Sequence, residues 1–286
     1  MGIKTDGKAL ADNICLDFKA RCDVLKSRNI NPVLTIVTSG EDSASKVYVR
    51  NKVKRCEEIG IKVDVQHFDK LDCVGVDNIV GSIQNPIIVQ EPITGGATHV
   101  YVAGKLFALY DVDGFSHLNM ALLATGEKPC HCSCTPSGVM RLLEEYNIPL
   151  EGKNALVIGR SNIVGRPMAM MLEQAGCTVT VAHSKTNKES LIDDFIYSDI
   201  VVSAVGKKDV IVYRDLRENF SLETLNEKIL IDVGMNRDEN GKLCGDFSEE
   251  LKQKAAYYTP TPGGTGPMTV AMLMQNVIEY YENYYF

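Results

Sequence analysis

The chain lacks the features that would place it in a membrane or on a nucleic acid. No apolar run approaches the ~20 residues that a membrane-spanning helix needs, and the N-terminal residues contain no signal-peptide core. The formal net charge is −7, whereas neutralising nucleic-acid phosphates requires a basic face. Hydrophobic residues make up 45% of the chain and charged residues 23%, as in a globular protein. We therefore expect a cytoplasmic protein that binds neither nucleic acid nor a membrane.

Paired cysteine motifs are also missing. The nine cysteines are odd in number, and most stand singly in apolar patterns, where a free thiol behaves as a small hydrophobic side chain. With no export signal, we expect these thiols to be reduced. Only Cys130, Cys132 and Cys134 form a cluster, and their spacing is not that of a C-x-x-C zinc knuckle. We predict no metal site.

The length of 286 residues is sufficient for two domains, each with its own core. In the first half, apolar or alternating patterns predict strands over residues 32–37, 61–65 and 87–89. Ser43 or Ser45 can cap a helix that runs to Ile59 and ends at Gly60. Such a βαβ-type unit binds ligands at the carboxyl ends of its strands, which here means residues 39–40 and 90–92.

A strand–turn–helix signal stands in the second half. The four apolar residues 155–158 lead into Gly159, which allows a tight turn, and Gly165 allows a helix to approach the strand. Pro167 suits the first turn of that helix, and Gly176 its C-terminal end. Free N–H groups at such a helix start bind a pyrophosphate, so we predict a nucleotide site. The alternative is an ordinary α/β turn without a ligand.

The elements around this turn predict a parallel sheet. Residues 199–206 and 229–234 are apolar runs that end in glycine, as in strands buried on both faces, and residues 137–146 predict a connecting helix. The alternating residues 177–182 end at His183–Lys185, where NAD-binding sites place an acid for the ribose hydroxyls. No acid stands there. Ser184 can donate to a 2′-phosphate and Arg160 can supply charge, which favours NADP over NAD.

Tyr48 and Lys52 are a candidate proton-transfer pair. They stand four residues apart, so both project from one side of the predicted helix. The expected core-facing stripe is Val49, Val53 and Cys56, which puts the pair at the margin of the buried face. A phenol beside an ammonium can support proton transfer. The alternative is a solvated basic face. Short-chain dehydrogenases use a tyrosine and a lysine at the same spacing. In those enzymes the pair follows the nucleotide turn within one domain, whereas in this chain the pair precedes the nucleotide turn.

Two further segments carry polar or flexible residues. Asp111 and Asp113 precede a glycine turn, and a carboxylate there can accept paired N–H bonds from an aminopyrimidine-like edge. An acidic surface turn is the alternative. Residues 262–267 are a Pro/Gly-rich loop before a helix, which suits an anion, a close-approaching ligand or a hinge. That helix has an apolar stripe that needs a partner surface: Val270, Leu273, Met274, Val277, Ile278 and Tyr281.

Eight of these stretches occur in the order found in one enzyme family. They are Ser45–Lys52, Val89–Gln90, Asp111–Phe115, Cys134–Gly138, Gly159–Pro167, His183–Thr186, Asp232–Asn236 and Thr259–Thr269. The chain resembles the methylenetetrahydrofolate dehydrogenase/cyclohydrolase family, the bifunctional folate enzymes of one-carbon metabolism. The chain departs from the family pattern at Glu91, where a leucine is usual, at Tyr110, where a lysine is usual, and in a contracted motif around Asp246.

The resemblance implies two α/β domains around a cleft. Residues 1–123 and 262–286 would form the folate-binding catalytic domain, and residues 124–261 a Rossmann-type parallel-sheet domain that binds NADP. The family oxidises 5,10-methylenetetrahydrofolate with NADP+ and hydrolyses the methenyl product to 10-formyltetrahydrofolate. The resemblance also implies a homodimer. The alternatives are a monofunctional dehydrogenase and a folate- or nucleotide-binding protein without turnover.

The resemblance also implies site residues, which we state as expectations. The catalytic residues would be Lys52, Tyr48, Gln90 and Asp113. Further contacts to tetrahydrofolate derivatives would come from Val89, Glu91, Pro262, Gly263, Gly264 and Gly266. Contacts to NADP would come from Gly159, Arg160, Ser161, Gly165, Ser184 and Met235.

Overall fold

The computed structural model describes residues 2–216 and 225–284, which form two α/β units. We call Asp12–Cys134 together with residues 270–284 the three-stranded unit. Residues 2–11 and 135–269, within the described ranges, are the six-stranded unit. The units differ from the sequence-based boundaries, because residues 2–11 and 262–269 belong to the six-stranded unit and residues 124–134 to the three-stranded unit. The physical reason at the N-terminus is a short strand that pairs there.

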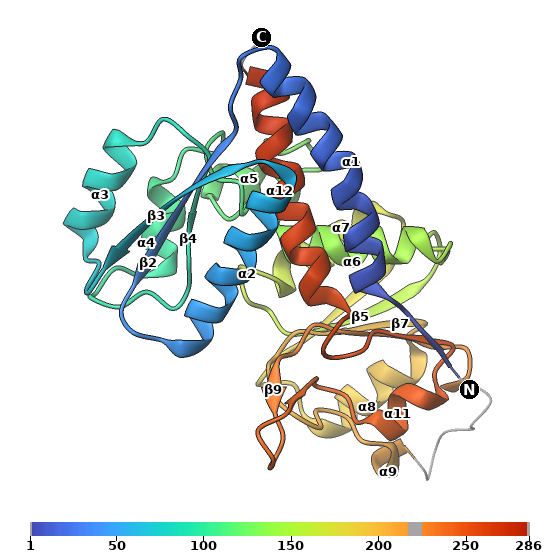
Figure 1. Ribbon diagram of the computed structural model, residues 1–286. Coiled ribbons are helices and arrows are strands. Elements are labelled where there is room, and N and C mark those ends of the chain that lie inside the picture. Colours follow the sequence, from blue (N-terminus) through green and yellow to red (C-terminus); the bar gives the residue numbers. More distant parts are fainter. Residues whose placement is uncertain (1, 217–224, 285–286) are drawn as a thin grey trace. The chain divides into compact units, whose positions relative to one another are not determined.

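The three-stranded unit contains a parallel sheet with the order β3-β2-β4 (Figure 1). Its strands are β2 (Val33–Ser39), β3 (Lys62–Phe68) and β4 (Ile87–Val89). All three were expected, although β3 continues three residues beyond its predicted end because it stays in register with β2 up to the pair Ser39–Phe68. The central strand β2 is apolar and almost wholly buried, as a strand covered on both faces should be.

Helix α2 (Ser43–Ile59) connects β2 to β3 and ends as predicted at Gly60, whose φ of 90° is left-handed. The predicted N-cap was wrong. The cap is Asp42, whose side chain accepts a hydrogen bond from the Ser45 backbone N–H at 2.6 Å. A residue just before the first helical turn is the one whose side chain reaches the N–H groups of that turn.

Five further helices contribute to this unit. They are α3 (Cys73–Ser82), α4 (His99–Lys105), α5 (His117–Ala124), α1 (Gly7–Ser27) from Asp12 onward and α12 (Thr265–Tyr284) from Val270 onward. The expected C-terminal helix is thus present, and its Tyr281 hydroxyl accepts a bond from the Val33 N–H and donates to the Val33 carbonyl, both at 3.1 Å. Arg21 of α1 forms a two-bond ion pair with Glu282 of α12. These bonds fasten α12 to β2 and α1.

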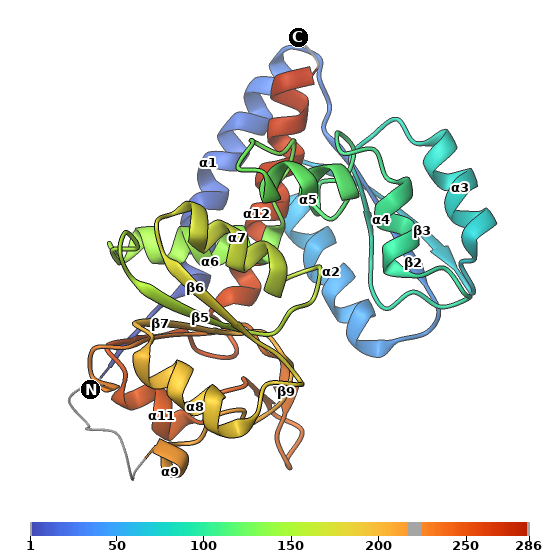
Figure 2. The ribbon, with the colours of Figure 1, turned by 180° about the vertical axis from the view of Figure 1, so that it is seen from behind.

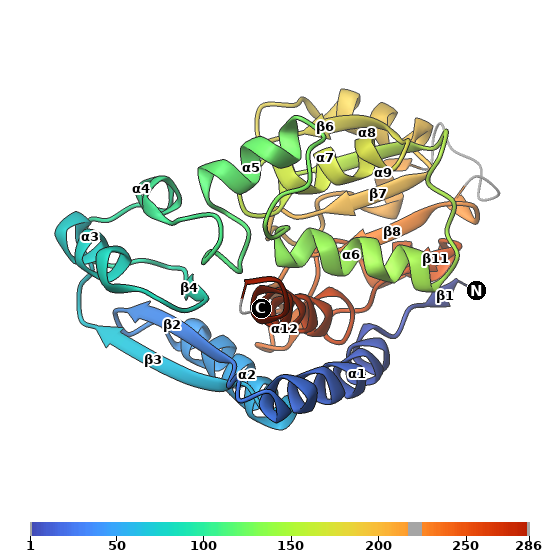
Figure 3. The same ribbon diagram turned by 90° about the horizontal axis from the view of Figure 1, so that it is seen from above.

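The six-stranded unit is a fully parallel sheet with the order β1-β11-β8-β7-β5-β6, as expected for a Rossmann-type domain (Figure 3). The strands are β1 (Ile3–Lys4), β5 (Asn154–Ile158), β6 (Thr178–Ala182), β7 (Ile200–Ser203), β8 (Ile229–Asp232) and β11 (Tyr257–Tyr258). The edge strand β1 pairs with β11, so Ile3 and Lys4 lie beside Tyr257 and Tyr258, more than 250 residues away in the sequence. A short antiparallel pair, β9 (Asn236–Arg237) and β10 (Leu243–Cys244), follows β8.

Helices cover both faces of this sheet (Figure 2). On one face, α6 (Cys134–Glu145) and α7 (Gly165–Gln174) pack against alternate strand residues such as Val157 and Val202. On the other, α8 (Lys188–Tyr197), α9 (Tyr213–Leu216) and α11 (Glu249–Lys254) cover the intervening residues such as Leu156 and Val201. Both faces of β5 and β7 are therefore core. In neither unit does a described helix have the length and apolar content to cross a membrane.

Candidate active site

The buried lysine Lys52 is the centre of the site in the three-stranded unit. Its Nζ donates a hydrogen bond to Gln90 Oε1 at 2.9 Å, and only 7% of the residue is exposed. Gln90 follows the carboxyl end of β4, where its backbone N–H bonds to the Val37 carbonyl at 2.8 Å. The Gln90 Nε2 donates to the Glu91 carbonyl at 3.0 Å, which leaves Oε1 facing the lysine.

The position of Lys52 on α2 differs from the expected helix face. The buried residues of α2 are Ser45, Lys52, Cys56 and Ile59, so the lysine lies on the core-facing side rather than at its margin. Of the expected stripe, Cys56 is buried as predicted, whereas Val49 and Val53 are only half-buried. The neighbouring cations Lys46, Arg50 and Lys54 are exposed, so the solvated basic face exists without Lys52. A lysine buried in this way has given up its hydration for protein contacts.

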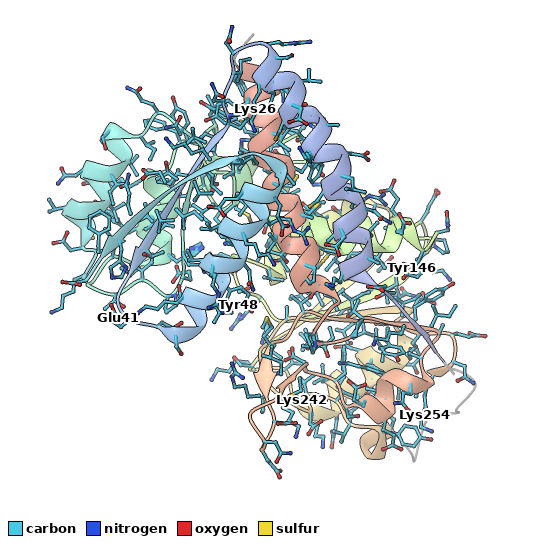
Figure 4. The ribbon with its side chains drawn as sticks, viewed as in Figure 1. Lys26, Glu41, Tyr48, Tyr146, Lys242 and Lys254 are labelled. Carbon is cyan, nitrogen blue, oxygen red and sulfur yellow. The ribbon has the colours of Figure 1, made fainter. Side chains whose placement is uncertain are left out.

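Tyr48 lies one helical turn before Lys52 and is half-buried (Figure 4). Burial raises the pKa of its phenol. The hydroxyl therefore remains protonated at neutral pH and can act as a hydrogen-bond donor. The pair predicted from sequence spacing thus consists of a neutral phenol beside a buried amine.

A small cavity of about 10 Å³ lies beside β4 and brings several predicted substrate residues together. Val89, Glu91 and Asp113 all line it. His99 and Phe115, which the sequence analysis did not single out, line it as well, with ring centroids 5.4 Å apart. His99 Nε2 is buried and has no hydrogen-bond partner within the described residues. No sequence signal marked His99, because only the tertiary fold brings α4 against the turn at Phe115.

The two aspartates of the glycine turn have different environments. Asp111 is fully buried and accepts hydrogen bonds from the N–H groups of Gly114 at 3.1 Å and Ser116 at 2.5 Å, and from Asn119 Nδ2 at 3.2 Å. Burial raises the pKa of Asp111 to about 6, although these bonds oppose the shift. Asp111 therefore shapes the turn, and both aspartates line the small cavity.

The buried thiol of Cys134 relates Lys52 to Asp113. Burial is the main reason that the pKa of this thiol is raised well above its ordinary value, and the charge of Asp113 raises it further. The charge of Lys52 acts in the opposite direction. The thiol donates to the Val112 carbonyl at 3.3 Å. Both charged groups are therefore within electrostatic range of one buried sulfur atom.

The nucleotide turn has the geometry that its glycines predict. Gly159 has a φ of 123°, and a Cβ there would lie 2.7 Å from the Ala204 carbonyl oxygen. A Cβ at Gly165 would overlap the Gly159 carbonyl. Both positions therefore require glycine, the first for its conformation and the second for the close approach of α7 to β5.

One expectation for this turn was wrong. The Ser161 hydroxyl accepts hydrogen bonds from the N–H groups of Val164 at 3.1 Å and Gly165 at 3.3 Å. They belong to the N-cap residue and the first residue of α7, at the helix start that the sequence analysis left free for an anion. A serine four residues before the first helical residue can bond to these groups from the loop, and here it does.

A cavity of about 930 Å³ opens at the carboxyl ends of β5, β6 and β7. Ser184 lines it, whereas Gly159, Arg160, Ser161, Gly165 and Met235 are not among its lining residues. Its lining residues are Ile158, Ala182, His183, Ser184, Thr186, Lys188, Leu191, Val205, Lys207, Asp209, Val210, Val212, Tyr213, Ser248 and Glu250. The volume, the apolar strand ends and the hydroxyls and cations after β6 fit a phosphorylated dinucleotide. Lys207 was missed, although it follows the glycine that ends a predicted strand.

The Pro/Gly-rich loop belongs to the six-stranded unit. The Gly263 carbonyl accepts a hydrogen bond from the Lys8 N–H at 3.0 Å, and the Thr265 hydroxyl donates to the Asp232 carbonyl at 3.3 Å. Gly263 has a φ of 101°, which favours glycine. Pro262 follows a cis peptide bond, as does Pro92 in the other unit. Hydrogen bonds to its own unit therefore fix the loop, which does not favour the hinge interpretation.

Across residues 2–216 and 225–284, no group of three or more His, Cys, Asp and Glu side chains is arranged to hold a metal ion. In the cysteine cluster, Cys134 is fully buried and bonds to a backbone carbonyl. Cys130 interacts with the Tyr284 hydroxyl, which contributes to the raised pKa of that tyrosine.

Comparison with known proteins gives matches to both units. Residues 5–113 match the family model described as tetrahydrofolate dehydrogenase/cyclohydrolase, catalytic domain. Residues 133–285 match the NAD(P)-binding domain of the same family. A bifunctional protein FolD from Campylobacter jejuni is 41% identical over 286 residues, which cover 97% of this chain and 98% of the relative.

Solved structures agree with these matches. The FolD methylenetetrahydrofolate dehydrogenase/cyclohydrolase of C. jejuni superposes with a TM-score of 0.88 at 38% identity, covering 97% of this chain and 98% of that one. The Trypanosoma brucei methylenetetrahydrofolate dehydrogenase-cyclohydrolase, solved with NADP and an inhibitor, also gives 0.88, at 30% identity and with 98% and 97% coverage.

Proposed function

Because this chain belongs to the tetrahydrofolate dehydrogenase/cyclohydrolase family, we propose that it oxidises 5,10-methylenetetrahydrofolate and then hydrolyses the methenyl product to 10-formyltetrahydrofolate. NADP+ accepts the hydride in the first step. Transfer between two bound rings depends mainly on orientation, whereas hydration of the methenyl cation requires a group that moves protons. The two activities therefore make separate demands on the residues of the chain.

Lys52 is the proton-transfer group of the hydrolytic step in this proposal. The observation that carries this assignment is the buried 2.9 Å contact between its Nζ and Gln90 Oε1. A neutral amide oxygen fixes the amine without a carboxylate that would hold its proton. Tyr48, one turn earlier on α2, supplies a protonated hydroxyl to orient the substrate. Gln90 in turn sets the direction of the Lys52 side chain.

Asp113 anchors the pterin ring in this proposal. Its carboxylate can accept two N–H bonds from the aminopyrimidine edge of that ring. Val89 and Glu91, which line the small cavity beside β4 together with Asp113, are proposed as neighbouring folate contacts. The loop residues Pro262, Gly263, Gly264 and Gly266 are proposed as further folate contacts.

The six-stranded unit is proposed as the NADP-binding domain and the three-stranded unit as the folate-binding domain. Ser184, on the wall of the 930 Å³ cavity, would donate to the 2′-phosphate, and Arg160 would supply charge from the turn. Gly159 and Gly165 admit the pyrophosphate by bringing α7 close to β5, and Ser161 holds the turn between them. Met235 is proposed to contact the nucleotide from the segment after β8.

We also infer a cytoplasmic homodimer. The nine cysteines are all unpaired thiols in the structure, which suits a reducing compartment. The edge strand β6 presents exposed side chains, among them Val181 at 41%, on a sheet whose other edge is β1. Analytical ultracentrifugation of the purified chain tests the dimer directly.

One assay tests the activities. Methenyltetrahydrofolate absorbance is followed after adding 5,10-methylenetetrahydrofolate with and without NADP+, against an enzyme-free blank. Formation that requires NADP+, followed by decay faster than the blank, supports the bifunctional enzyme. Formation without enzymatic decay would reduce the proposal to a monofunctional dehydrogenase, and no formation would leave a binding protein.

A further inference from the structure

Two buried carboxylates lie at the carboxyl edge of the six-stranded sheet, and neither belongs to the predicted nucleotide site. Asp232 is the last residue of β8, and Asp246 follows β10 by two residues. Their exposed fractions are 1% and 0%. A buried carboxylate is costly unless hydrogen bonds or a cation compensate for its lost hydration. Both have such partners, and the partners show what the carboxylates do.

Asp232 holds the segment that contains Asp246. Its Oδ2 contacts Lys252 Nζ of α11 at 2.7 Å, a cation that is itself fully buried. The same carboxylate accepts hydrogen bonds from the backbone N–H groups of Asp246 at 2.8 Å and Phe247 at 3.2 Å. The backbone at residues 246–247 is therefore fixed against the end of β8.

Asp246 in turn holds the segment that follows β7. Its Oδ2 accepts hydrogen bonds from the Ser203 hydroxyl at 2.7 Å and the Val205 N–H at 3.0 Å. Its Oδ1 accepts from the Lys207 N–H and from Asn236 Nδ2, both at 2.9 Å. All four donors are uncharged, and hydrogen bonds to a carboxylate are stronger than those between two neutral groups.

Two glycines make room for these carboxylates. A Cβ at Gly234 would overlap the Asp246 carboxylate, and one at Gly245 would overlap that of Asp232. Neither glycine has the positive φ that a turn would require, so space is the reason for glycine at both positions. The packing leaves no freedom for the carboxylates to move aside.

The held segment forms part of the nucleotide cavity, because Val205 and Lys207 both line it. We propose that Asp246 is a positioning residue for the nucleotide: it fixes the backbone from Val205 to Lys207 and so sets the shape of that wall. This inference rests on the proposed NADP site. Asp246 does not touch the cavity, and its effect passes through the two backbone N–H groups that it binds.

The Asp246→Asn variant tests this role, because the amide keeps the shape of the side chain but turns an NH2 group toward two donors. We expect the KM for NADP+ in the dehydrogenase assay to rise by about tenfold or more. Hydrolysis of added methenyltetrahydrofolate without NADP+ uses the three-stranded unit, so its rate should stay within about twofold of wild type. Ser203→Ala removes one of the four bonds and should give a smaller rise, of about threefold.

Lys228→Met is the matched control. Lys228 is also buried, at 2% exposed, and its Nζ donates to the Ile196 carbonyl at 2.9 Å and to that of Ser198. It directly precedes β8 and so lies at the amino end of the strand whose carboxyl end is Asp232. We expect this control to lower Tm without changing the KM for NADP+.

The possible results separate the positioning role of Asp246 from the proposed function of the protein. An unchanged KM for NADP+ in both Asp246→Asn and Ser203→Ala would overturn the positioning role. So would an equal loss of both activities in Ser203→Ala, since that pattern reports general destabilisation. If Asp246→Asn does not fold, Ser203→Ala decides. The absence of both activities from the wild-type enzyme would instead refute the proposed function.

Discussion

Replacing Lys52 by methionine removes the amine and keeps a side chain of similar length and apolar stem. In the structure this amine is 7% exposed and bonds only to Gln90 Oε1 among the described residues, at 2.9 Å. The variant leaves that amide oxygen without its donor, which costs about 1–3 kcal/mol. It also removes a buried ammonium, which offsets part of this cost. We therefore expect a folded protein with a small change in Tm.

The effect on catalysis should be much larger and should separate the two activities. Positioned proton transfer contributes about 10²–10⁴-fold, so hydrolysis of methenyltetrahydrofolate by Lys52→Met should fall by that factor. Hydride transfer depends on orientation and should retain measurable activity, with kcat reduced by about tenfold at most. The absorbance assay should then show methenyltetrahydrofolate accumulating with NADP+ instead of decaying.

Lys54→Met is the control on the same helix. The Lys54 side chain is 76% exposed and pairs with Glu58 at 3.8 Å, so its removal takes away one positive charge without touching the buried site. Both activities of this control should match wild type. Hydrolysis at the wild-type rate by Lys52→Met would refute the role given to Lys52. Equal loss of both activities would also refute it, because the lysine would then serve binding alone.

Three other changes test different parts of the structure. Gly165→Ala places a methyl group against the Gly159 carbonyl, so Tm should fall and the KM for NADP+ should rise by about tenfold or more, while a normal KM would show that the turn adapts. Burial raises the pKa of Asp111 from 3.8, its value in the unfolded chain, to about 6 in the folded protein. Its contribution to the free energy of unfolding is therefore fully present below pH 3.8 and is lost as the pH rises through 6. The unfolding free energy of wild type minus that of Asp111→Asn should therefore fall by up to about 3 kcal/mol between pH 4 and 7 in urea titrations, and parallel curves would contradict this. His99→Phe keeps a ring against Phe115 but removes the unpartnered Nε2, so Tm should hold or rise while the KM for folate increases about threefold; an unchanged KM would mean that this nitrogen does not face the substrate.

Local rules explain why the nucleotide turn was predictable. The apolar strand, the two glycines and the helix start are all set by residues within about 20 positions of one another. The same holds for α2 and Gly60, and for the short strand β4. Helix α1 obeys the helical period as well, with Phe18, Cys22 and Leu25 buried, and a search for that period would have found it.

The rest of the site depends on distant contacts that no local pattern records. Lys52 faces inward toward Gln90, which directly follows β4, and the sequence of the helix alone does not predict an inward-facing lysine. The bonds from the Ser161 hydroxyl to the start of α7 were not predictable either, because a serine in a loop has the same sequence signal whether it binds a nucleotide or bonds to backbone N–H groups. The network of Asp232 and Asp246 joins four separate segments, so only the folded chain reveals it.

The way the chain is distributed between its units bears on how the protein is made. The edge strand β1 cannot pair until Tyr257 and Tyr258 have been synthesised, and β2 receives its bonds from Tyr281 later still. Neither unit is therefore complete until most of the chain has been synthesised. Neither unit can finish folding before most of the other has been synthesised, in contrast to a protein whose domains follow one another along the chain.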